Sequence, residues 1–311
     1  MADEFWAVTF LFNAAREPRR LANYHVFRQR LGCPLLTVEM AMDGAFQLQS
    51  HDADVLLQFD QGDAMWQKER LFNIGAAHLP TGCTAVAMLD ADILFTNPNW
   101  TDDTLSALKA APVVQLFTHC IRLDRDQVPG GPSPPKALDQ VRGVVDAIAK
   151  GTPLADCFSD PTVSRQQLMS WGFAWAYRRD LIERHGAYDA HIMFGGDTAI
   201  AAACFGAMAD VDRRHRLSSA HRAHYFKWAG PWFDDVKNRV AVLNADAYHL
   251  WHGSIRGRYT ADWHAAMGAL AFDPVKDLID TPGKPWRWAG NKPALENLLN
   301  DYFAFRQASQ D

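Results

Sequence analysis

Ala85-Val86-Ala87-Met88-Leu89-Asp90-Ala91-Asp92 is the stretch that says most about the architecture of this chain. Five apolar residues, a strand's length, run directly into two carboxylates spaced i, i+2. Strands that are apolar on both faces belong to parallel sheets covered by helices on both sides, and such sheets bind ligands beyond the carboxyl ends of their strands. The stretch therefore predicts a buried strand whose end carries Asp90 and Asp92 into a ligand site.

Apolar runs and helix-like stretches alternate through the first part of the chain. Strands are expected at 5–12, 34–40, 55–59 and 113–118, and helices at 16–31 and about 64–78. This alternation predicts βαβαβ order and a mostly parallel sheet. A Pro- and Gly-rich break at 128–135 then predicts a loop or lid.

Beyond this break the sequence predicts an α+β second half. Helices are expected at about 136–150, from about 179 and at 291–306, an apolar stretch at 171–177, and a Gly-Gly-Asp turn at 195–197 that leads into a helix at 199–205. The sequence shows neither an internal repeat nor a low-complexity tract. We therefore expect one α/β fold with a soft boundary near the Pro-rich break.

The composition is that of an ordinary globular protein. Of the 311 residues, 48% are hydrophobic and 22% are charged, which excludes a disordered or collagen-like chain. The formal net charge of -5 gives no overall basic excess of the kind that advertises nucleic-acid binding. No apolar run approaches the length of about 18 residues that a membrane-spanning helix needs, so no span is expected.

Two further features bear on the compartment. The first apolar run, 5–12, is short and follows Asp3 and Glu4, where a secretory signal would carry Lys or Arg. The five cysteines are odd in number and far apart, which suits neither a disulfide framework nor a zinc knuckle. We therefore expect a cytoplasmic protein.

Asp90 and Asp92 have the position of metal ligands. Carboxylate oxygens at a strand end suit Mg²⁺ or Mn²⁺, which bind through one or two carboxylates and let substrate phosphates complete the coordination shell. The alternative is that both aspartates cap a turn after the strand, which is common for aspartate. The surrounding motifs favour the metal.

Four segments together resemble one known family. Asp90-Ala91-Asp92 after an apolar strand resembles the DxD motif of GT-A glycosyltransferases, which chelates the metal bound to a nucleotide-sugar diphosphate. The segment 66–75 resembles the K-x-x-x-x-N-x-G helix that precedes this strand in many family-2-like transferases, with Lys68 and Asn73 at the matching positions. The third segment, 170–197, resembles a galactosyl- and N-acetylgalactosaminyl-transferase block, and the fourth, 249–253, resembles the late histidine segment of these enzymes.

The resemblance covers roughly residues 5–260 and implies both fold and activity. It implies a GT-A domain over 1–260, with a nucleotide-sugar-binding half at about 1–127 and an acceptor and catalytic half at about 136–260, followed by a C-terminal helical extension at 261–311. The implied activity is a metal-dependent glycosyltransferase that uses a nucleotide-sugar, most simply a UDP-sugar, with Mn²⁺ or Mg²⁺. The block departs from the family at Phe194, Asp197 and Thr198, which leaves the acceptor open.

The resemblance also assigns roles at the metal and the reacting bond. Asp92 is expected to ligate the metal, Asp90 to contact the ribose or a metal-bound water, and His249 or His252 to complete the shell, a choice that their spacing leaves open. For these histidines the alternative is packing beside Trp251. Asp197 is expected to be the general base of an inverting displacement; the alternative is that it caps the following helix.

Donor contacts are expected from polar residues near the first two strands and from later cations. Lys68, rather than the neighbouring Arg70, is expected to reach the diphosphate, with Asn73 as its partner, and Glu39 to contact the nucleoside. The remaining candidates for donor binding are Thr9, Asn13, Arg16, Arg256 and Arg258.

A basic segment bears on the acceptor. Between residues 213 and 258 nine Lys and Arg stand against three Asp, with histidines and aromatics interleaved. Such a mixture grips a diphosphate, stacks on a sugar, or holds a nucleic-acid backbone. A saccharide and a hydroxyl-bearing modified DNA base therefore both stay open as acceptors. Two rival functions also remain, a non-catalytic nucleotide-sugar or glycan-binding module and a metal-dependent nucleotidyltransferase.

Overall fold

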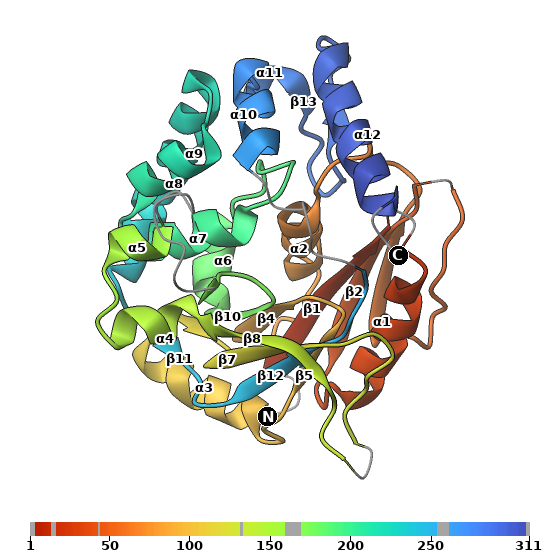
Figure 1. Cartoon of the computed structure of the whole chain (residues 1–311), viewed down its shortest axis with the longest axis vertical. Helices are drawn as coiled ribbons and strands as arrows, with labels where there is room; N and C mark the ends of the chain where they lie inside the picture. The colour runs from red at the N-terminus through yellow and green to blue at the C-terminus, as the bar shows by residue number, and fades with distance from the viewer. Residues whose placement is uncertain are drawn as a thin grey trace.

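A seven-stranded mixed sheet forms the centre of the molecule (Figure 1). The computed structural model describes residues 4–13, 17–42, 44–130, 133–158, 169–253 and 261–308. In the order β11-β6-β10-β4-β1-β2-β3, the strands are Val240–Val242, Val113–Gln115, Ala174–Arg178, Ala85–Leu89, Phe5–Phe12, Leu35–Met40 and Val55–Phe59. All run parallel except β10, which is antiparallel to both of its neighbours. The prediction of an α/β fold with a largely parallel sheet is confirmed.

Both faces of the sheet are covered, as the apolar strands require. Every residue of β1 is buried, and its side chains divide by alternation between two hydrophobic clusters. Helices α2 (Lys68–Ala76), α7 (Gly196–Cys204) and α9 (Ser219–Val236) contribute to the cluster on one face. Helices α1 (Arg19–Arg30) and α3 (Trp100–Ala110) contribute to the cluster on the other.

A second sheet of five strands brings the late histidines to the DxD turn. Its order is β5-β12-β7-β8-β9, with bounds Ile93–Phe95, Asp246–His249, His119–Leu123, Ala137–Gly143 and Met169–Ser170. Strand β5 begins directly after Asp92 and pairs antiparallel with β12, so that His249 lies opposite Ile93. The register of this sheet therefore places the end of β12 beside Asp92.

The prediction of one helix is partly wrong. Residues 136–150 were expected to be helical throughout, yet 137–143 form strand β8 and only Val144–Ala149 form helix α4. The strand is held by antiparallel pairing with β7, from His119 opposite Arg142 to Leu123 opposite Ala137. Pairing between distant segments has overridden the local helical preference here.

The C-terminal part of the chain packs against the helix that precedes β4. The side-chain amide of Gln67 accepts a hydrogen bond from the backbone N–H of Trp286 at 2.7 Å and donates one to its carbonyl at 3.0 Å. Arg70 donates to the carbonyl of Thr281 at 2.8 Å. The remaining elements are α5 Leu154–Phe158, α6 Arg179–His185, α8 Met208–His215, α10 Ala261–Ala269, α11 Pro274–Asp277, α12 Pro293–Ala308, β13 Leu278–Ile279 and β14 Arg287–Trp288. Helices α9 to α12 all lie on one side of the large sheet, at the top of Figure 1.

In the part of the chain that the structure describes, none of the helices combines the length and the apolar character that crossing a membrane requires.

Candidate active site

A cavity of about 370 Å³ lies where β1 and β4 end. Its wall combines carboxylates, cations, imidazoles and aromatic rings from both sheets and from the C-terminal helices. The polar and aromatic lining residues include Phe10, Phe12, Arg20, Trp66, Lys68, Asp90, Asp92, Arg122, Trp171, Phe173, Asp197, Thr198, Arg214, His249, His252 and Arg306. The cavity thus lies at the sheet edge where ligands were expected, and it gathers Asp90, Asp92, Asp197, Lys68, His249 and His252 in one place.

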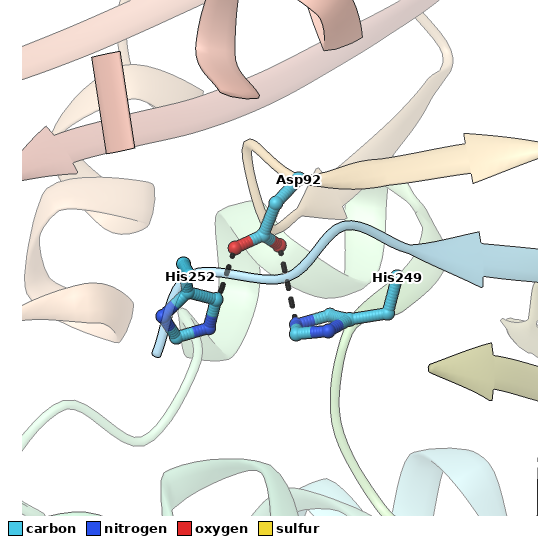
Figure 2. A group of neighbouring side chains, drawn as sticks. All are labelled: Asp92, His249 and His252. Carbon is cyan, nitrogen blue, oxygen red and sulfur yellow. Dashed lines mark ion pairs between the residues drawn. The ribbon is translucent and has the colours of Figure 1, made fainter. Parts of the chain in front are cut away.

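Asp92, His249 and His252 form a group with metal-ligand geometry (Figure 2). One donor atom from each of the three side chains lies within 4.8 Å of the other two. The Nε2 atoms of His249 and His252 lie 3.5 and 3.6 Å from the two carboxylate oxygens of Asp92. Spacing alone left the choice between the two histidines open, and the structure brings both to the carboxylate.

The surroundings of Asp92 favour its ionised form. Burial alone would raise the pKa of this carboxyl, but the neighbouring His249 and His252, and then Arg20, outweigh burial and hold the pKa below its ordinary value. A carboxylate and two imidazoles within this distance fit a divalent cation such as Mn²⁺, which accepts both oxygen and nitrogen ligands. The donor set of this chain therefore fits the expected metal.

Asp90 points to a different partner from Asp92. Its Oδ1 lies 2.7 Å from the Nζ of Lys68, and Lys68 also donates to Oδ2 of Asp197 at 2.8 Å. The Lys68 side chain is only 2% exposed; burial would lower its pKa, but the two carboxylates outweigh this and raise it. The pKa of Asp90 is raised to about 6, first by burial and then, against the effect of Lys68, by the charges of Asp197 and Asp92. Lys68 thus bridges two carboxylates and stays charged.

Asp197 enters the cavity from the first turn of α7. The N-cap of this helix is Gly195, in a left-handed conformation with φ 93°, so the alternative interpretation of Asp197 as the cap is wrong. The Oδ1 atom of Asp197 is buried and has no hydrogen-bond partner among the described residues. A side chain at Gly172 would place its Cβ 2.7 Å from Oδ2 of Asp197, so glycine at this position leaves room for the carboxylate.

The sequence analysis did not identify Glu69, which is buried close to Lys68 and Asp197. A Cβ at Gly196 would lie 2.2 Å from Oε1 of Glu69, so the carboxyl group packs directly against the start of α7. Burial, and then the charge of Asp197, raises the pKa of Glu69 well above its ordinary value. Glu69 follows Lys68 in the K-x-x-x-x-N-x-G helix, but the motif itself carries no signal for an acid there.

A second cavity, of about 440 Å³, lies beside the metal group at the ends of β1 and β2. Asn13, Glu17 and Glu39 line it. Glu39 accepts hydrogen bonds from the backbone N–H of Gln47 at 2.6 Å and from Nε2 of Gln58 at 2.8 Å, so it holds the loop that forms one wall. The side-chain amide of Asn13 accepts a hydrogen bond from the backbone N–H of Glu17 at 2.8 Å and donates one to its carbonyl at 2.9 Å.

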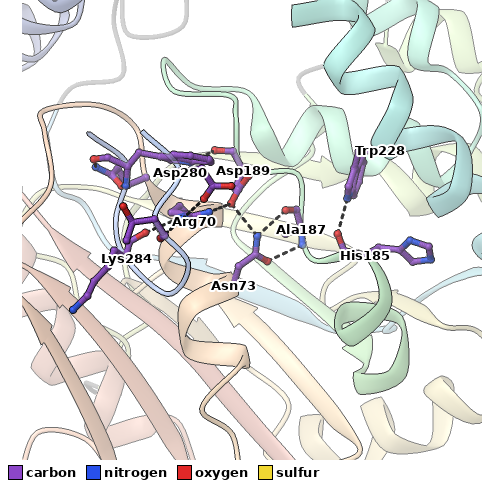
Figure 3. Close-up of polar contacts among 11 residues, drawn as sticks. Arg70, Asn73, His185, Ala187, Asp189, Trp228, Asp280 and Lys284 are labelled. Carbon is purple, nitrogen blue, oxygen red and sulfur yellow. Dashed lines mark hydrogen bonds and ion pairs between the residues drawn. The ribbon is translucent and has the colours of Figure 1, made fainter. Parts of the chain in front are cut away.

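Two expected donor contacts lie elsewhere. The Thr9 hydroxyl donates to the carbonyl of Leu89 at 2.8 Å inside the sheet. Asn73 exchanges hydrogen bonds with the backbone of Ala187 and also contacts Asp189, as Figure 3 shows. In the same view Arg70 bonds to Asp189, Asp280 and the carbonyl of Lys284.

Thr9 and Asn73 thus bind to backbone groups near the site, and neither of them lines either cavity. Arg16, Arg256 and Arg258 lie outside the described residues.

Comparison with known proteins finds similar chains among solved structures. No protein-family model matches this sequence, and no curated protein matches it. Three of the similar solved structures serve as examples. S. aureus TarS 1-349 is 10% identical, with 98% of this chain and 72% of that chain covered at a TM-score of 0.39.

The glucosyl-3-phosphoglycerate synthase of Mycobacterium tuberculosis was solved with Mn²⁺, UDP and phosphoglyceric acid. It is 12% identical, with 86% of this chain and 76% of that chain covered at a TM-score of 0.37. The 4-diphosphocytidyl-2C-methyl-D-erythritol synthase of Anaerococcus prevotii is 10% identical, with 78% and 88% covered at a TM-score of 0.36. All three TM-scores are below 0.5, so the ligands and the reaction of this chain have to be argued from its own residues.

Proposed function

We propose that this chain is a metal-dependent glycosyltransferase that moves a sugar from a nucleotide-sugar, a UDP-sugar, to an acceptor hydroxyl with inversion at the anomeric carbon. The observation that carries the proposal is one cavity holding both a three-residue metal group and, beside it, a lysine-held aspartate with an unpartnered buried oxygen. The metal group would stabilise the leaving diphosphate, and the aspartate would accept the proton of the attacking hydroxyl.

The metal group serves the leaving side of the reaction. Asp92, His249 and His252 would hold Mn²⁺ or Mg²⁺, and the bound ion would neutralise the charge on the diphosphate. Glu17 connects the second cavity to this group, because it lines that cavity and its carboxylate lies 3.1 Å from His252. We place the nucleoside of the donor there, against Asn13 and Glu39, and the sugar in the larger cavity.

Asp197 serves the attacking side. Lys68 occupies Oδ2, which fixes the carboxylate, and Oδ1 has no hydrogen-bond partner among the described residues, so it is the oxygen we assign to the acceptor's proton. In the displacement the acceptor oxygen bonds to the anomeric carbon, the bond from that carbon to the diphosphate breaks, and the hydroxyl proton passes to Asp197. Because attack and departure take place on opposite faces of the sugar, the product is inverted. Lys68 is a positioning residue in this scheme, bound to Asp90 and Asp197 rather than to the diphosphate.

The acceptor is a saccharide or a hydroxyl-bearing modified DNA base. The guanidinium of Arg214 lies 4.7 Å from the centre of the Trp171 ring in the wall of the larger cavity, and Arg122 and Thr198 line it too. A cation stacked on an aromatic face suits either acceptor. Transfer to duplex DNA that falls steeply with added salt identifies the base, and salt-insensitive transfer to an oligosaccharide identifies the sugar.

The two rival functions predict different products. A nucleotidyltransferase would release pyrophosphate, and it would leave the pairing of Asp92 with both late histidines unexplained. A binding module would be stabilised by UDP and Mn²⁺ yet release no UDP on long incubation. The lysine-held Asp197, next to the metal group, favours turnover over binding alone.

The test is a screen of nucleotide-sugars with Mn²⁺ or Mg²⁺, read by thermal shift and by UDP release. We expect one donor to raise the melting temperature and to be hydrolysed slowly only with metal, and Asp92→Ala to abolish both effects. The matched control is Asp102→Ala, which removes an exposed carboxylate on α3 that lines neither cavity. If no nucleotide shifts the melting temperature with either metal, the proposed function is wrong.

A further inference from the structure

We infer that Glu17 and Arg306 are positioning residues of the metal site, through which the C-terminal helix α12 sets the orientation of His252. This inference rests on the proposed metal-dependent function and adds two residues to it. Neither residue belongs to a motif of the sequence, and Arg306 lies in the segment that was expected to be a mere extension. The Arg306–Glu17–His252 chain of contacts is called the relay below.

The contacts of the relay are short and buried. The Nδ1 atom of His252 lies 3.1 Å from Oε2 of Glu17, and Nη2 of Arg306 donates to Oε1 of the same carboxylate at 2.6 Å. The side chain of Glu17 is 0% exposed and that of Arg306 is 2% exposed. The two oxygens of Glu17 thus have different partners: Oε1 accepts from Arg306 of α12, and Oε2 contacts His252 of the metal site and also Arg20 of α1 at 3.5 Å.

The relay determines which nitrogen of His252 faces the metal. An ionised carboxylate can only accept hydrogen bonds, so Nδ1 of His252 must carry the proton that it donates to Glu17. The lone pair is then on Nε2, the atom that lies 3.6 Å from Oδ2 of Asp92. A carboxylate on the far nitrogen of a metal-binding histidine both fixes the ring and strengthens it as a ligand.

Arg306 is itself held in place by its surroundings. Its guanidinium lies 5.3 Å from the centre of the Trp66 ring and 5.9 Å from that of Tyr302. Helix α12 is anchored by four buried side chains on the same side as Arg306: Leu295, Leu299, Tyr302 and Phe303. Because the relay is formed before any metal arrives, it lowers the cost of ordering His252 on binding, and its loss weakens the metal directly.

The experiment measures Mn²⁺ binding to the full chain without donor, by the paramagnetic resonance signal of free Mn²⁺. We expect Glu17→Gln to weaken binding about 10- to 100-fold, the range for losing such a supporting carboxylate. Arg306→Met acts through Glu17, so it should weaken binding as well, and should add little when Glu17→Gln is already present. Arg306→Lys, which keeps the charge, should restore part of the affinity.

Controls separate a positioning role from loss of stability. Leu299→Ala removes a fully buried side chain of α12 that has no part in the relay, and should lower the melting temperature while leaving the Kd for Mn²⁺ unchanged. Gln307→Ala alters an exposed neighbour of Arg306 and should change neither.

Native affinity in Glu17→Gln, or simple additivity of Glu17→Gln and Arg306→Met, overturns the inference while the proposed function stands. Failure of the unaltered chain to bind Mn²⁺ overturns the metal site and the relay together.

Discussion

The Nε2 atom of His249 lies 3.5 Å from Oδ1 of Asp92, although the two residues lie far apart in the sequence. The contact is a consequence of sheet pairing, because β12 ends at His249 and lies against β5, which starts after Asp92. Three residues further along the chain, His252 reaches the other oxygen of the same carboxylate. One aspartate flanked by two imidazoles is therefore built into the register of the smaller sheet.

This donor set predicts a preference for Mn²⁺ over Mg²⁺. Imidazole nitrogen binds first-row transition ions more strongly than it binds Mg²⁺, which favours oxygen ligands. We expect the concentration of Mn²⁺ that gives half of the maximal thermal shift to be at least about tenfold below that of Mg²⁺. His249→Ala should remove most of this preference, since one nitrogen ligand is lost. Equal half-saturating concentrations of the two ions in the unaltered chain would contradict the assignment of the histidines.

Asp197→Asn should separate binding of the donor from transfer. The amide cannot accept the proton of the acceptor hydroxyl, so the transfer rate should fall by about 10²- to 10⁴-fold. The metal group is untouched, so the thermal shift with UDP and Mn²⁺ should be kept. The two readouts are steady-state transfer and thermal shift on the same preparation. A variant that transfers at the native rate would remove Asp197 from the role of base.

Much of the architecture was predictable because its signals are local. The buried strand β4 and the carboxylates after it follow from five apolar residues and an i, i+2 spacing, and β1 and β2 follow from apolar runs bounded by turns. The gathering of Asp92, Asp197 and Lys68 followed from their resemblance to a family. Strand β8 was missed because its pairing with β7 is decided between segments and not within one.

The supporting residues could not have been found in this way. Glu17 and Arg306 meet across almost the whole length of the chain, and neither stands in a recognisable pattern. Glu69 is set apart only by its burial against the start of α7. Such residues act through the surroundings that the folded chain gives them, and periodicity and spacing carry no information about those surroundings.

Replacing Lys68 by methionine should destabilise the protein in a pH-dependent way. The substitution leaves Asp90 and Asp197, whose side chains are 25% and 21% exposed, without the cation that both contact. Removing one partner of a fully buried ion pair costs about 3–5 kcal/mol, and we expect a smaller loss for these partly exposed carboxylates. The pKa of Asp90 is raised to about 6, so the cost is larger at pH 7.5, where this carboxyl is charged, and shrinks at pH 5 as acid neutralises it. Urea denaturation at pH 7.5 and pH 5 measures this. A loss of stability that is the same at both values would contradict the electrostatic cause.

Four buried histidines predict a second dependence of stability on pH. His191, His215, His221 and His264 pack against one another around a small cavity, with ring centroids 5.0 Å apart for His191 and His215 and 4.2 Å apart for His215 and His264. Burial lowers the pKa of His191 to about 3 and lowers those of the other three well below the ordinary value, with help from neighbouring positive charges. All four are therefore neutral in the folded protein near pH 6.

The sign follows from proton uptake. Below about pH 6.5 the unfolded chain protonates these histidines and the folded chain does not, so the free energy of unfolding falls as the pH falls. Each histidine contributes about 1.4 kcal/mol per pH unit in this range. Asp90, whose pKa is raised to about 6, acts in the opposite direction, so the comparison has to be made against a variant.

His191→Gln should flatten the dependence between pH 6.5 and pH 5 by about one proton, while His51→Gln, at a side chain that is 80% exposed, should leave it unchanged. Urea denaturation at half-unit steps measures the slope. The same slope in His191→Gln as in the unaltered chain would mean that His191 takes up its proton equally well in the folded and unfolded states.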